Sequence, residues 1–81
     1  MFTVYILRSL KNKKRYVGHT SKAALIRLRE HNAGGSKWTR ENGPFVIIKT
    51  EEFADKKLAM QREKFLKSGQ GRKWLDENIE N

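Results

Sequence analysis

The chain has 81 residues, in which 18 Lys and Arg face 9 Asp and Glu, for a formal net charge of +9, and it has no cysteine. This length predicts a single domain over residues 1–81. The absence of cysteine excludes disulfides and cysteine-based zinc sites. The longest apolar runs, such as Phe45–Ile48, are far shorter than the roughly 18 residues that cross a bilayer. We therefore expect a cytoplasmic protein with no membrane segment.

The positive charge is confined to one half of the sequence. Residues 1–50 hold 11 Lys and Arg and 2 carboxylates, whereas residues 51–81 hold 7 of each. If the first half folds onto one side, it presents a positive surface to a polyanion such as nucleic acid. The alternative interpretation is that the charge only keeps a small protein soluble.

The first elements along the chain are predicted to be a β-hairpin and a helix. Residues 2–7 are rich in β-branched and aromatic side chains, and the polar residues 11–14 separate them from a second strand at Tyr16–Gly18. Ser21 can then cap a helix over Lys22–His31, which the residues after it bring to an end.

The second half of the chain predicts one strand and two further helices. Residues 33–44 are expected to form a loop, and the strand Phe45–Thr50 follows it. Asp55 can cap a helix over Lys56–Lys67, and a last short helix is expected at Arg72–Glu80. The predicted order is therefore β-β-α-β-α-α.

Both longer helices carry polar groups at the border of their predicted buried faces. Helical spacing assigns to these faces Ala24, Leu25 and Leu28 in the first helix, and Leu58, Ala59, Phe65 and Leu66 in the second. Arg27 and His31, four residues apart, project together from one flank of the first face. Arg62 lies at the centre of the second face, where it must pair or reach solvent, and Glu63 lies at the edge. Helices made only for packing would more naturally place such groups on the opposite side.

Two tyrosines of the hairpin can lie on one face of the sheet. Tyr5 and Tyr16 share a face if the residue numbers of each cross-strand pair add to an odd sum. A sum of 21 would make the two tyrosines direct cross-strand neighbours. For each tyrosine taken alone, the alternative is that it is simply a good strand residue.

Four motifs in order then resemble the GIY-YIG nuclease superfamily, which includes the cleavage domain of the bacterial excision-repair nuclease UvrC and small stand-alone proteins. The motifs are Thr3–Tyr5, Tyr16–Gly18, Arg27–His31 and Ala59–Lys67, and the resemblance spans residues 2 to about 75. It implies an α+β fold, with a three-stranded antiparallel sheet flanked by helices. It also implies hydrolysis of DNA phosphodiester bonds with one divalent cation.

The resemblance assigns the catalytic positions to Tyr5, Tyr16, Arg27, His31 and Glu63. Glu63 matches the metal-binding glutamate, and a single carboxylate suits Mg²⁺ (or Mn²⁺), because Mg²⁺ keeps most of its waters. Arg27 offers a planar fork for the scissile phosphate. Either tyrosine is a candidate general base, whose pKa the surrounding cations would lower, and His31 could take on the proton. All five side chains are expected to line one open concavity.

Further basic residues of the hairpin are predicted to contact the DNA backbone; they are Arg8, Lys11, Lys13, Lys14, Arg15 and His19. With 81 residues there is no room for a module that reads sequence, so specificity is expected to come from a branched or damaged substrate or from a protein partner. DNA repair is the role that the resemblance suggests. The alternative function is a non-catalytic nucleic-acid-binding or partner-interaction module on the same fold.

Overall fold

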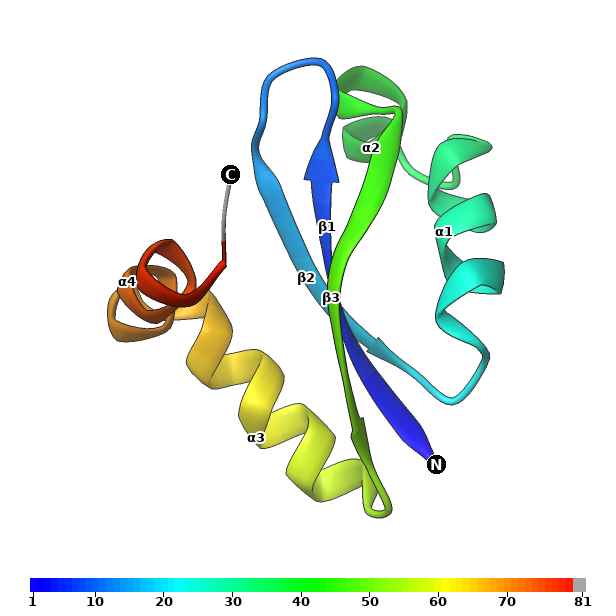
Figure 1. Cartoon of the computed structure of the whole chain (residues 1–81). Coiled ribbons are helices and arrows are strands. Elements are labelled where there is room, and N and C mark those ends of the chain that lie inside the picture. Colours follow the sequence, from blue (N-terminus) through cyan, green and yellow to red (C-terminus); the bar gives the residue numbers. More distant parts are fainter. Residues whose placement is uncertain (80–81) are drawn as a thin grey trace.

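The computed structural model describes residues 1–79 and contains a three-stranded antiparallel sheet in the order β2-β1-β3. Helices cover both faces of the sheet, α1 and α2 on one side and α3 and α4 on the other (Figure 1). The elements are β1 (Phe2–Ser9), β2 (Arg15–Thr20), α1 (Ala24–Asn32), α2 (Lys37–Asn42), β3 (Phe45–Phe53), α3 (Lys56–Lys67) and α4 (Gly69–Asn78). The predicted α+β fold class is confirmed. Glu80, where the last helix was expected to end, lies outside the described residues.

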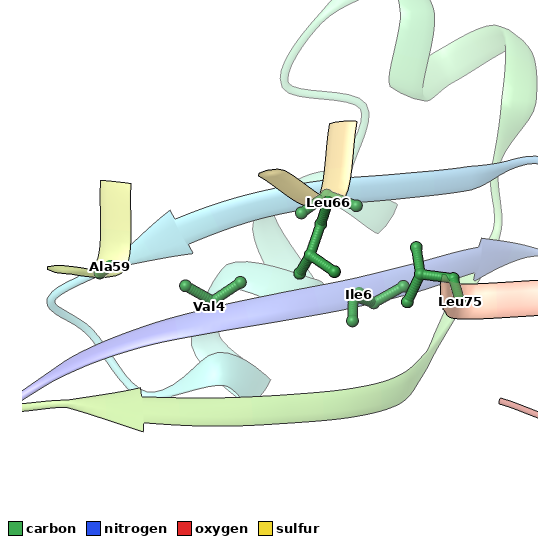
Figure 2. Packing of buried hydrophobic residues seen from close by; sticks show 6 residues of the cluster. Val4, Ile6, Ala59, Leu66 and Leu75 are labelled. Carbon is green, nitrogen blue, oxygen red and sulfur yellow. The ribbon is translucent and has the colours of Figure 1, made fainter. Parts of the chain in front are cut away.

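The central strand β1 separates two cores. Alternate side chains of a strand point to opposite faces, and all four residues from Val4 to Leu7 are buried. The core beneath α3 and α4 contains Val4, Ile6, Ala59, Leu66 and Leu75 (Figure 2). The core on the face of α1 contains Tyr5, Leu7 and Phe45. Across residues 1–79, no helix combines the length and the apolar character needed to cross a bilayer.

The register of the hairpin places the two tyrosines on one face but not directly opposite each other. Tyr5 pairs with Gly18 and Leu7 pairs with Tyr16, so the paired numbers add to 23. This sum is odd, and the two phenol rings share a face with their centroids 6.3 Å apart. They are diagonal neighbours, and the direct pairing considered from the sequence is wrong.

The turn of the hairpin explains this register. The Ser9 N–H donates a hydrogen bond to the Lys14 carbonyl at 2.9 Å, and these residues close the loop. The Ser9 hydroxyl also accepts hydrogen bonds from the N–H groups of Lys11 and Asn12. Lys13 turns the chain back with a φ of 64°. These local bonds move the turn one position along the chain from where a sum of 21 would centre it.

The first helix begins later than the sequence predicts, and Ser21 does not cap it. The strand β2 continues through Thr20, whose hydroxyl accepts a hydrogen bond from the Lys22 N–H. That bond forms a turn between strand and helix. Ala24 is therefore the first helical residue, and Ala23 at the N-cap supplies no side-chain hydrogen bond.

Two leucines that were expected to be buried face solvent, Leu25 with 65% of its surface exposed and Leu58 with 50%. The side chains that face the sheet are Ala24, Leu28 and His31 in α1, and Ala59, Arg62, Glu63 and Leu66 in α3. The other residues predicted for these faces, Ala24, Leu28, Ala59, Phe65 and Leu66, do pack against the two cores. The polar residues His31, Arg62 and Glu63 also point at the sheet.

The region expected to be a loop, residues 33–44, contains the short helix α2. The Ser36 hydroxyl accepts a hydrogen bond from the Thr39 N–H at 3.2 Å, and the Thr39 hydroxyl accepts one from the Ser36 N–H at 3.0 Å. This reciprocal capping box is the sequence signal for α2, with Thr in the place of the usual Glu or Gln. Trp38 of α2 stacks on Phe45 with ring centroids 5.6 Å apart, so the helix closes the second core.

Two leucines of α3 provide a matched test of this packing. We expect Leu66→Ala to lower the free energy of unfolding by about 3 kcal/mol, because Leu66 is 1% exposed and its loss leaves a cavity. Leu58→Ala, on the same helix, should cost less than about 0.5 kcal/mol. Urea denaturation followed by circular dichroism measures both values, and equal losses would show that α3 packs in another rotation.

Candidate active site

The phenol of Tyr5 lies directly over Gly18 of the edge strand β2. A Cβ atom added at Gly18 would lie 2.5 Å from Tyr5 Oη and 3.2 Å from Tyr16 Cε1. Any side chain at this position would therefore displace the hydroxyl of Tyr5. The glycine of the second motif is required for the close approach of these two strands' side chains.

The helix α1 brings His31 to the two tyrosines. The Tyr5 hydroxyl lies 3.0 Å from His31 Nε2, and both residues are buried. The His31 ring lies 4.8 Å from the Tyr16 ring, measured between centroids. On its other side Tyr16 lies 5.3 Å from the Trp38 ring. Three of the predicted site residues thus form one aromatic cluster on the α1 face of the sheet.

Burial shifts the pKa values of Tyr5 and His31 within this cluster. Burial raises the pKa of Tyr5, hydrogen bonding to Arg27 lowers it in part, and the nearby Tyr16 and Glu63 charges raise it further. The expectation that surrounding cations lower the phenol pKa is therefore wrong for Tyr5. Burial, followed by the positive charge of Arg27, lowers the pKa of His31. Neutral His31 can then accept the hydroxyl hydrogen of Tyr5.

Arg27 projects from α1 with its side chain 38% exposed. Its Nη1 donates a hydrogen bond to Glu30 Oε1 at 3.2 Å. It lines a pocket that also contains His19 and Lys22. The guanidinium is thus anchored on one side and open to a pocket on the other, which suits the binding of an anion.

Glu63 projects from α3 on the opposite face of the sheet, and two side chains hold its carboxylate. His19 Nδ1 donates to Oε1 at 2.5 Å, and Lys67 Nζ donates to Oε2 at 2.8 Å. Burial alone would raise the pKa of Glu63, but the hydrogen bonds from Lys67 and His19 outweigh it and hold the pKa below its ordinary value. The carboxylate is therefore charged at neutral pH.

The predicted site residues are divided among adjoining pockets instead of lining one concavity. Tyr16 lines a first pocket, Glu63 a second and Arg27 a third. Lys67 belongs to both the first and the second pocket, and His19 belongs to both the second and the third. The three pockets thus lie next to one another along the edge strand β2.

The predicted phosphate-contact residues have several different environments. Arg15 forms an ion pair with Asp76, and Lys11 Nζ donates a hydrogen bond to the Glu41 carbonyl at 3.0 Å. His19 holds Glu63 as described above. The remaining three are Lys13 and Lys14, exposed at the hairpin turn, and Arg8, half-buried in β1.

The sequence did not identify the cations that surround Glu63. Four lysines of α3 line its pocket, and they are Lys56, Lys57, Lys64 and Lys67. Two carboxylates of the charge-balanced half are bound elsewhere, Glu51 by Arg62 and Asp76 by Arg15. The positive field is therefore not confined to residues 1–50. The spacing of four residues between Glu63 and Lys67 on one helix was the available signal.

The donor set around Glu63 fits a largely hydrated divalent cation. Among the residues that the structure describes, Glu63 is the one carboxylate that lines its pocket, and its side chain is 19% exposed. Within residues 1–79, His, Asp and Glu form no group of three or more that could hold a metal ion. Mg²⁺ binds through one or two carboxylates together with waters and phosphate oxygens, so a single carboxylate suffices for it. A closed protein cage, as a structural zinc ion requires, does not fit these residues.

The lowered pKa of His31 predicts a pH dependence of stability. Where unfolded His31 binds a proton and folded His31 does not, the free energy of unfolding falls as the pH falls. The loss should begin near pH 6.5, the approximate pKa of an unperturbed histidine, and continue down to the pKa of folded His31. Urea unfolding between about pH 8 and about pH 5 should show this loss in the natural chain and a flatter profile in His31→Gln.

A matched control is His19→Gln, which removes the imidazole on the opposite face of the sheet. This variant should keep the loss that depends on His31. An identical profile in His31→Gln and the natural chain would contradict the assignment of a buried, neutral His31.

Comparison with known proteins supports the resemblance stated from the motifs. The family model described as the GIY-YIG catalytic domain matches residues 1–75. A UPF0213 protein of Natronomonas pharaonis is 42% identical over 66 residues, which cover 80% of this chain and 75% of the relative. A UPF0213 protein of Oceanobacillus iheyensis is 41% identical over 74% of this chain and 69% of the relative, and one of Staphylococcus haemolyticus is 38% identical over 80% and 78%. No solved structure gives a significant match. With the family model covering most of its length, this chain belongs to the GIY-YIG family.

Proposed function

We propose that this chain is a divalent-metal-dependent endonuclease that hydrolyses phosphodiester bonds in DNA. The observation that carries the proposal is that two groups of candidate residues contact neighbouring positions of the edge strand β2. Tyr5 lies over Gly18 on one face, and Glu63 is bound by the next residue, His19, on the other. A charged carboxylate and a buried phenol–imidazole pair are thus separated by a single strand, within a rim of lysines.

Arg27 and the surrounding lysines bind the phosphate backbone in this proposal. The planar guanidinium of Arg27 can donate two hydrogen bonds to one phosphate, and its hydrogen bond to Glu30 holds the guanidinium in place. Lys22 and Lys56 line the same pocket and add positive charge. Positive charge near the scissile phosphate stabilises the negative charge that grows in the transition state.

Tyr16 is the better candidate for the general base. Tyr5 is 1% exposed, its pKa is raised and its hydroxyl already contacts His31. Tyr16 is only half-buried and lines an open pocket that contains Lys14 and Lys67. A base must reach the water that it deprotonates. Tyr5 and His31 then position the ring of Tyr16.

Glu63 is the ligand for the divalent cation, Mg²⁺ or Mn²⁺. The ion would supply positive charge to the phosphate and to the leaving oxygen. The hydrogen bonds of Lys67 and His19 keep Glu63 ionised, which is the form of a carboxylate that binds a metal ion. A branched or damaged substrate or a protein partner would supply specificity. A role in DNA repair and a cytoplasmic location stay predictions.

The substitution Glu63→Gln tests the proposed activity. We expect it to lower the rate of DNA cutting in Mg²⁺ or Mn²⁺ by about 10²-fold or more, because it removes the one carboxylate of the pocket. Binding of the same DNA should stay equal or become tighter, because a negative charge is lost near the phosphates. Gel assays of plasmid nicking and fluorescence anisotropy measure the two quantities.

Glu52→Gln is the matched control, because Glu52 is an exposed carboxylate of β3 outside the three pockets. It should cut DNA like the natural chain. Continued metal-dependent cutting by Glu63→Gln would refute the assignment. Absence of cutting by the natural chain with either ion would favour the non-catalytic binding module, and an affinity that is flat between about 50 and 200 mM salt would reject phosphate contacts altogether.

The two tyrosines are distinguished by Tyr16→Phe and Tyr5→Phe. We expect Tyr16→Phe to lower the cutting rate by about 10²- to 10⁴-fold, the range of general base catalysis, with little change in stability. Tyr5→Phe keeps the ring in the core and loses only the hydroxyl contact to His31, so its rate should fall less. Single-turnover rates measure both, and a larger loss in Tyr5→Phe would assign the base to Tyr5.

A further inference from the structure

Within residues 1–79 the ammonium of Lys67 has one anionic partner, and there is a second position that it could occupy. Its ammonium lies 2.8 Å from Glu63 Oε2, on the same helix and four residues further on. The side chain of Lys67 is 52% exposed, whereas that of Glu63 is 19% exposed. The lysine is therefore the mobile partner of this pair, because exposed long side chains are held only weakly by surface ion pairs.

The second position is the pocket on the other side of Lys67. This pocket, of about 520 Å³, is also lined by Lys14, Arg15 and Arg72. Among the described residues, its lining contains four cations and no carboxylate. Such a surface attracts an anion. A lysine at its border can reach either way, because the ammonium sits on a flexible four-carbon stem.

We infer that Lys67 is a displaceable counterion, which neutralises Glu63 in the metal-free protein and turns to a nucleic-acid phosphate in the adjoining pocket when the metal ion binds. The inference rests on the proposed function, because it takes Glu63 as the metal ligand. Lys67 is a positioning residue in this scheme. It acts through Glu63 before the ion binds, and through the DNA backbone afterwards.

Electrostatics supports the exchange of partners. An ammonium and a divalent cation repel each other when both lie within a few ångströms of one carboxylate. The ion pair with Lys67 therefore has to weaken for the metal to bind. Of the other cations of the pocket, Arg15 is already paired with Asp76, so a released ammonium beside Lys14 and Arg72 is stabilised best by a phosphate. Metal and DNA then strengthen each other's binding by the same factor, as thermodynamic linkage requires.

The first experiment measures binding of Mn²⁺ alone, by electron paramagnetic resonance, to the metal-free protein without DNA. We expect Lys67→Met to bind Mn²⁺ about five- to tenfold tighter than the natural chain, because the competing ammonium is gone. Lys64→Met is the matched control. Lys64 lies on α3 and lines the pocket of Glu63, but its ammonium forms no ion pair within residues 1–79. Its Mn²⁺ affinity should change by less than about twofold.

The second experiment measures where Lys67 makes its other contact. Binding of a labelled DNA duplex is titrated at several salt concentrations, in EDTA and in Ca²⁺. In Ca²⁺, Lys67→Met should lower the salt slope by about one unit, the value for one lost phosphate contact. In EDTA the same substitution should change the slope less, because Lys67 then remains on Glu63.

The outcomes separate this inference from the proposed function. Mn²⁺ binding that is unaffected by Glu63→Gln overturns both, because Glu63 is then not the metal ligand. Mn²⁺ binding that requires Glu63 but is no tighter in Lys67→Met overturns the inference alone, as does a salt slope that Lys67→Met changes equally in EDTA and Ca²⁺. Lys67→Gln is a second, polar substitution that should behave like Lys67→Met, and the melting temperature of each variant shows whether it is folded. Because Lys67 is half-exposed, we expect neither substitution to disturb the fold.

Discussion

Two successive residues of the edge strand, Gly18 and His19, connect the two halves of the candidate site. Strand alternation points Gly18 to the tyrosine face and His19 to the α3 face. The missing side chain of Gly18 admits the Tyr5 hydroxyl, while His19 holds the Glu63 carboxylate. A shift of one residue in the pairing of β2 would exchange these faces and break both contacts at once. The hairpin turn at Ser9, which sets the register, is therefore as important to the site as the residues in it.

The two charged groups that α3 directs at the sheet, Arg62 and Glu63, both have partners, and this constraint shapes the chemistry. Arg62 would be costly beneath α3 if it were unpaired. Its Nε and Nη2 donate to the two carboxylate oxygens of Glu51 at 2.8 Å and 3.1 Å, and its guanidinium lies 4.6 Å from the Trp74 ring. Glu63 one residue later receives His19 and Lys67 in the same manner. The difference is that Glu63 and Lys67 line a pocket, whereas Arg62 and Glu51 line none of the three pockets described above.

Local patterns predicted most of the elements, and they failed where two local signals compete. The apolar strands, the cap at Asp55 and the family motifs led to the correct fold class, because each depends on neighbours in the chain. The start of α1 was misplaced because Thr20 binds the Lys22 N–H and keeps Ser21 out of the helix. The helix α2 was missed because Thr39 replaces the usual Glu or Gln of a capping box. Leu25 of α1 was also expected in the core, but it is exposed, and His31 is buried beside Ala24 and Leu28 instead.

The sequence by itself determined the family, the sheet and the identity of the five candidate catalytic residues, since these follow from short motifs in a fixed order. Only the tertiary structure decided how those residues are arranged. It placed Tyr5, Tyr16 and His31 together on the α1 face of the sheet and Glu63, which comes from α3, on the other face. It also raised the pKa of Tyr5 by burial and brought His19 to Glu63. Desolvation and contacts between residues more than forty positions apart depend on the folded chain as a whole, and no local pattern contains them.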